Sequence, residues 1–116
     1  MTTAYVIVAI ATMVANAAAA IADFAGAEFV RKTSAELGIS ETWLPLLGVL
    51  KAAGAVGLLV GLLEISWIGI AAAVGLVLFF VGALIFHFRA RVFHNFAAPA
   101  TYLALAVASL VLALAI

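Results

Sequence analysis

Four apolar stretches, each about as long as a membrane-spanning helix, most constrain what this chain can fold into. They cover residues 4–22, 43–63, 67–86 and 97–116. A helix needs ~20 mostly apolar residues to cross a hydrocarbon core ~30 Å thick. The stretches lack the period-2 alternation that is typical of membrane β-barrel strands. The sequence therefore predicts an all-α integral membrane four-helix bundle, as one domain with no large soluble part.

The composition excludes several other classes of protein. Of the 116 residues, 70% are hydrophobic, and five basic residues balance five acidic ones. A soluble domain is nearer half apolar and a quarter charged, and it could not bury this much apolar surface. The zero net charge gives no electrostatic basis for nucleic-acid binding. The chain has no cysteine, which excludes disulfide scaffolds and thiolate metal sites.

The connections between the stretches predict the topology. Residues 64–66 form a tight turn, so the second and third spans are expected to be antiparallel neighbours. The connection 23–42 is highly charged and contains a predicted short helix over 34–38, closed by Gly38. With four spans, this connection and the connection 87–96 share one membrane face. That face carries Arg31, Lys32, Arg89 and Arg91, whereas the other face has no Lys or Arg. The positive-inside rule then places both connections in the cytoplasm and both termini outside.

Lys51 is the most costly side chain within the spans, and this makes it the first candidate for a ligand-binding residue. It lies eight residues after Trp43, which is ~12 Å along a helix that rises ~1.5 Å per residue. One interpretation is that its ammonium group snorkels to the cytoplasmic surface, aided by carboxylates at the end of the first span. The other is a buried cation that engages an anion, a quinone-type carbonyl or a lipid headgroup.

Four further polar residues are candidate ligand-binding residues: Asn16, Asp23, Glu28 and His87. Antiparallel register places Asn16 near the depth of Lys51, where an interhelical hydrogen bond is the simpler interpretation. Asp23 is the better carboxylate partner by depth, because Glu28 points elsewhere on a continuing helix. His87 ends the third span on the same side, and an imidazole can relay a proton near neutral pH. We expect Lys51 to point into the bundle beside Asp23, with Asn16 and His87 bordering the same cavity.

The sequence gives no basis for a catalytic or a metal-binding residue. His87 and His94 lie in one connection, whereas a bis-His haem needs ligands that face each other across the ring. A metal site would require Asp23, Glu28 and His87 to meet, and their spacing does not predict this. We expect no intrinsic cofactor.

The order of short motifs resembles that of the DoxX-like family of small bacterial four-helix membrane proteins. The resemblance covers nearly the whole chain and depends on Phe29, on the runs 37–39 (LGI), 47–51 (LGVLK) and 82–87 (GALIFH), and on Pro99. It implies a multi-pass protein of the bacterial inner membrane. Some relatives are linked to membrane-associated oxidoreductase complexes, to sulfur oxidation through the quinone pool, or to oxidative-stress defence. The resemblance carries Lys51 and His87 over as functional positions, and Asp23 and Glu28 less directly.

Three functions follow as hypotheses. The first is an accessory subunit of a larger membrane complex, with a bound quinone or lipid, rather than a free-standing enzyme. The second is a lipid-binding or structural protein that uses Lys51 and the basic connection on anionic headgroups. The third is a transporter of the small multidrug resistance type, which the sequence disfavours because the deep polar residue of the first span is Asn16 and not a carboxylate. The expected partners are membrane lipids and other integral membrane proteins or further copies of the chain.

Overall fold

The computed structural model describes residues 2–115, and this part of the chain contains five α-helices and no strand. The elements are α1 (Thr3–Ala25), α2 (Glu28–Leu37), a 3-10 turn η1 (Glu41–Trp43), α3 (Leu44–Leu63), α4 (Ser66–Ala90) and α5 (Ala97–Leu114). The segments Thr3–Ala25, Glu41–Leu63, Ser66–Ala90 and Ala97–Leu114 are long and apolar enough to cross a membrane. The predicted all-α class with four spans is confirmed.

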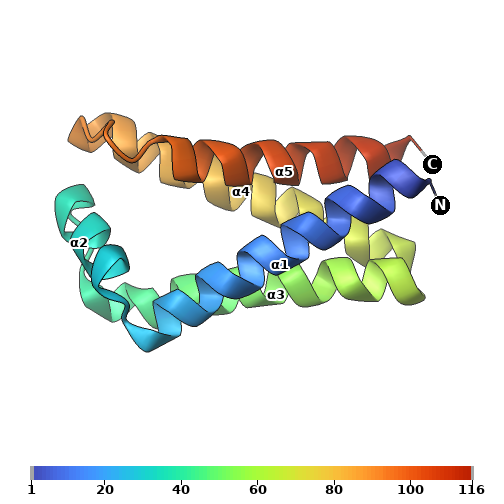
Figure 1. The fold of residues 1–116 in the computed structure, drawn as a ribbon, viewed down its shortest axis with the longest axis horizontal. Coiled ribbons are helices and arrows are strands. Elements are labelled where there is room, and N and C mark those ends of the chain that lie inside the picture. The colour runs from blue at the N-terminus through green and yellow to red at the C-terminus, as the bar shows by residue number, and fades with distance from the viewer. Residues whose placement is uncertain (1, 116) are drawn as a thin grey trace.

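The four long helices run lengthwise through a bundle of 41 × 24 × 18 Å (Figure 1). In cyclic order, α1 packs on α3, α3 on α4, α4 on α5, and α5 again on α1. The short helix α2 lies across one end, together with the α4–α5 connection (Figure 1). Both chain ends lie at the opposite end, where the α3–α4 turn also lies (Figure 1).

Small residues allow α3 and α4 to approach closely. A Cβ atom added to Gly61 would collide with the backbone of Gly69, and one added to Gly57 would lie 2.7 Å from the Cβ of Ala72. Close packing of this kind holds helices together in a membrane, where burial of apolar surface between helices gives little driving force. The position of these small residues therefore determines where α3 and α4 come closest to each other.

Polar contacts join α1 to α5 inside the bundle. The hydroxyl groups of Thr12 and Ser109 lie 2.9 Å apart, and both side chains are fully buried. One turn further along α1, the Tyr102 hydroxyl donates a hydrogen bond of 3.0 Å to the carbonyl of Ala15. Because no water competes for these groups in the hydrocarbon core, the two helices are held in one register.

Three helix ends differ from the predicted boundaries. The first helix continues past Asp23 to Ala25 and ends where Gly26 adopts φ 63°. Helix α4, which corresponds to the predicted third span, continues to Ala90, so His87 belongs to a helix. The short helix starts at Glu28 instead of residue 34, although Gly38 closes it with φ 73° as predicted. In the sequence, the first charged residue marks the predicted end of each helix. In the structure, a helix ends where its last carbonyl groups are capped by hydrogen bonds. Residue 116, within the predicted fourth span, lies outside the described residues.

Candidate functional site

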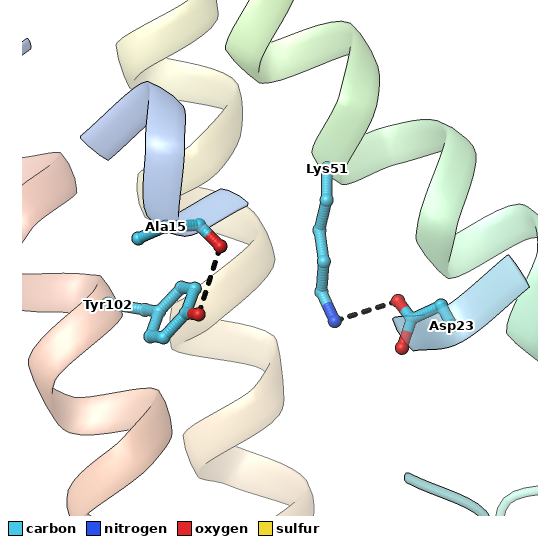
Figure 2. Close-up of polar contacts among 4 residues, drawn as sticks. All are labelled: Ala15, Asp23, Lys51 and Tyr102. Carbon is cyan, nitrogen blue, oxygen red and sulfur yellow. Dashed lines mark hydrogen bonds and ion pairs between the residues drawn. The ribbon is translucent and has the colours of Figure 1, made fainter. Parts of the chain in front are cut away.

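Lys51 and Asp23 form an ion pair inside the bundle. Lys51 projects from the first half of α3 towards the end of α1, where Asp23 lies (Figure 2). Its Nζ donates a hydrogen bond of 2.9 Å to Asp23 Oδ2, and the two side chains are only 15% and 3% exposed. The same Nζ lies 5.5 Å from the ring centroid of Phe79 on α4, within the range of a cation–π contact. Both interpretations of Lys51 include a carboxylate partner, and the structure supplies one in Asp23 with the ammonium group only partly exposed.

The ion pair lies in the wall of a cavity of about 650 Å³ at the α2 end of the bundle. Residues of α1, α2, α3, α4 and α5 line this α2-end cavity, and most of them are apolar. The polar residues in its wall are Asp23, Thr33, Ser34, Lys51, His87, Asn95 and Tyr102. Small-molecule sites have this character, with volumes of about 300–1,000 Å³ and a few polar groups in an apolar wall.

His87 lines the α2-end cavity from the last turns of α4, and its side chain is buried. Its Nδ1 lies 2.8 Å from the carbonyl oxygen of Ala83, one turn earlier in the helix. Because a carbonyl oxygen can only accept, this contact places a proton on Nδ1. The other ring nitrogen, Nε2, is buried and has no hydrogen-bond partner among the described residues. In the neutral ring, Nε2 is therefore an unsatisfied acceptor.

Asn95 is a lining residue that sequence reasoning missed. It lies in the α4–α5 connection, and its Nδ2 donates a hydrogen bond of 3.2 Å to the Thr33 hydroxyl on α2. Its Oδ1 is buried without a partner among the described residues. The arginines of the connection 87–96 predict a basic segment at the membrane face, and the one sequence signal of a buried polar residue is an amide within an aromatic run, 93–96 (FHNF).

Two of the predicted site residues do not belong to the α2-end cavity. Asn16 is fully buried in α1, but its Nδ2 donates to the carbonyl of Thr12 at 2.9 Å, and the residue is not part of the cavity wall. The structure therefore does not bring Asn16 to the cavity: its Nδ2 is used within α1, and its Oδ1 is buried without a partner among the described residues. Glu28 is exposed at the start of α2, because the chain leaves the α1 direction at Gly26.

His94 and the remaining charged residues lie outside the α2-end cavity. His94 Nε2 pairs with Glu36 of α2 at the surface. Within residues 2–115, no group of three or more His, Asp or Glu side chains is placed to hold a metal ion. The basic residues at this end of the bundle are exposed: Arg31, Lys32, Arg89 and Arg91.

The four apolar helices define a small multi-pass membrane protein, and the partly polar cavity at one end is its candidate binding site. The model of the DoxX-like family matches residues 7–109, which is most of the chain. The chain belongs to the DoxX-like family. It matches no curated protein and no solved structure.

Proposed function

We propose that this protein is an accessory subunit of a larger complex in the bacterial inner membrane, and that it holds a molecule of the quinone class in the α2-end cavity. The observation that carries the proposal is the Lys51–Asp23 ion pair in the wall of a mostly apolar cavity. A quinone combines a flat apolar ring with polar oxygens on its rim, and this combination matches the cavity wall.

Lys51 would supply the polar contact for such a ligand. An ammonium group has three N–H donors, and one of them is directed at Asp23. The side chain remains 15% exposed at the cavity wall, so a ligand oxygen can reach a further donor. Phe79, over which the ammonium lies, offers an aromatic face to a ligand ring.

The accessory role follows from what the lining side chains can do. They bind and orient a ligand, and none is a thiol that could exchange electrons with it. Electrons for a bound quinone would come from a partner protein, since electron transfer of this kind is performed by a redox cofactor. The proposal places the α2 end in the cytoplasm and both termini outside, because the exposed cations gather at the α2 end.

Ligand extraction tests this proposal. The full chain is purified from its native membrane in mild detergent, and bound small molecules and proteins are identified by mass spectrometry. We expect a quinone in the wild type and its loss in Lys51→Met, because the variant keeps the length of the side chain without the charge. Arg31→Met is the matched control, since it removes an exposed cation at the same end and should retain the quinone. A quinone content that is unchanged in Lys51→Met would contradict the proposal.

A second candidate function is the binding of anionic lipids. The observation that favours it is the set of four exposed basic residues at the α2 end, namely Arg31, Lys32, Arg89 and Arg91. Polybasic segments near a membrane surface attract anionic headgroups with about 1 kcal/mol per residue. For this function, extraction should yield an anionic phospholipid in place of a quinone, and Arg89→Gln should reduce it more than Lys51→Met.

A further inference from the structure

The two buried acceptors in the wall of the α2-end cavity point to the kind of polar head that the ligand carries. His87 Nε2 and Asn95 Oδ1 are both buried, and neither has a hydrogen-bond partner among the described residues. Buried polar atoms are nearly always paired in native proteins. A third unpaired acceptor, Asn16 Oδ1, lies away from the cavity, whereas His87 and Asn95 belong to its lining, where a bound molecule could supply the partner.

Both atoms need a donor from that partner. His87 Nδ1 is committed to the Ala83 carbonyl, which leaves Nε2 of the neutral ring with a lone pair and no proton. Asn95 Nδ2 is committed to the Thr33 hydroxyl, which leaves the amide oxygen free to accept. The two residues come from different elements, the end of α4 and the α4–α5 connection, and both line the same cavity.

Two donors of the cavity wall already have acceptors within the chain, and Lys51 keeps further N–H groups. Lys51 donates to Asp23, and the Tyr102 hydroxyl donates to the Ala15 carbonyl, as Figure 2 shows. A ligand that only accepts hydrogen bonds can approach Lys51, but it leaves His87 Nε2 and Asn95 Oδ1 unpaired. A ligand with hydroxyl groups can satisfy them.

We infer that the α2-end cavity selects the reduced, hydroxyl-bearing form of its aromatic ligand, a hydroquinone or phenol, with His87 Nε2 and Asn95 Oδ1 accepting its O–H groups. This inference rests on the proposed function and adds His87 and Asn95 as residues that determine specificity. The cavity thus stabilises the hydroquinone over the quinone.

The two forms of one short-chain quinone provide the test. The full chain in nanodiscs is titrated under anaerobic conditions with decylubiquinol, with decylubiquinone and with the dimethyl ether of the quinol, which cannot donate. We expect the quinol to bind about tenfold more tightly than either of the other two, since a net hydrogen bond between ligand and buried acceptor is of that order.

The variants separate a role in recognition from a role in folding. His87→Leu should weaken quinol binding severalfold and leave quinone binding unchanged, which reduces the preference. His87→Gln keeps an acceptor and should retain part of the preference. His94→Leu is the matched control, because this histidine pairs with Glu36 at the surface and does not line the cavity. If His87→Leu does not fold, Asn95→Ala in the connection should show a reduced preference by itself.

The outcomes distinguish the two proposals. Equal binding of quinol and quinone by the wild type would overturn the inference and leave the proposed function standing. A preference that survives both His87→Leu and Asn95→Ala would also overturn the inference. No binding of either form would overturn the inference and the proposed function together.

Discussion

Lys51 Nζ on α3 lies 2.9 Å from Asp23 Oδ2 on α1, and this contact joins residues that are 28 positions apart in the chain. The pair ties the end of α1 to the first half of α3 at the edge of the α2-end cavity. It also holds the ammonium group at the cavity wall. Lys51 is therefore a structural contact, and in the proposed function the same side chain also contacts the ligand.

The stability of the bundle should depend on the two charges together. Lys51→Met leaves a buried carboxylate without its cation, and Asp23→Asn leaves the cation without its carboxylate. We expect each single variant to lower the free energy of unfolding by about 1–3 kcal/mol, a discounted range because Lys51 is partly exposed. The double variant should be less destabilised than the sum of the two, with a coupling of about 1 kcal/mol or more. Thermal unfolding in one detergent measures all four proteins, and additive effects would show that the pair does not contribute.

Filling the α2-end cavity should abolish ligand binding without unfolding the protein. Gly82 lines this cavity, and a Cβ atom added there meets no atom within 4 Å. Gly82→Leu therefore places a side chain in the cavity with no clash against the backbone. Binding of decylubiquinol, measured by titration, should weaken more than tenfold, which is a loss above about 1.4 kcal/mol.

The matched control for this variant is Gly75→Leu. Gly75 lies two turns earlier on α4, is equally open around its Cβ position, and does not line the α2-end cavity. The Gly75→Leu variant should bind the quinol with the affinity of the wild type. Equal loss in both variants would place the ligand elsewhere or assign the effect to α4 as a whole.

The close approach of α3 and α4 gives a prediction about stability alone. Gly61→Ala sets a methyl group against the backbone of Gly69, and neither backbone can move away without separating the helices. Overpacking of this kind costs about 1–3 kcal/mol. Gly75→Ala, where a Cβ atom has open space, should leave the melting temperature unchanged or raise it. Equal melting temperatures for the two variants would show that α3 and α4 do not pack so closely.

The proposed orientation can be tested with single cysteines, because the chain contains none. Thr3 and Glu41 are exposed at opposite ends of the bundle. In intact cells, Thr3→Cys should react with a membrane-impermeant maleimide, whereas Glu41→Cys should react only after the membrane is opened. The reverse pattern would place the α2 end and its basic residues outside.

The long-range features of the fold could be predicted because membrane physics leaves few solutions. Four apolar stretches of sufficient length can only be helices, and the short turn at Glu64 makes α3 and α4 neighbours. The depth of Lys51 also predicted its contact with Asp23, since a lone ammonium in hydrocarbon is costly and only one carboxylate lay near that depth.

The details of the candidate site could not be predicted in the same way. Asn16 was expected in the cavity because depth alone does not specify which side of a helix a residue occupies, and its amide instead bonds to Thr12 within α1. Asn95 was missed because its burial depends on how the α4–α5 connection folds against Thr33 of α2. Such contacts depend on tertiary packing, which periodicity and charge counts do not report.

Photo-crosslinking tests the central claim, that the α2-end cavity binds a quinone-class ligand, most directly. The full chain in native-lipid nanodiscs is illuminated with an azidoquinone, and the labelled residues are identified by mass spectrometry. We predict labelling of the cavity wall on α4, between Leu78 and His87, and at the start of α5 around Pro99. Gly82→Leu should prevent this labelling, and Gly75→Leu should not. Labelling confined to lipid-facing residues such as Ile7 and Val56, or labelling that Gly82→Leu leaves unchanged, would contradict the account.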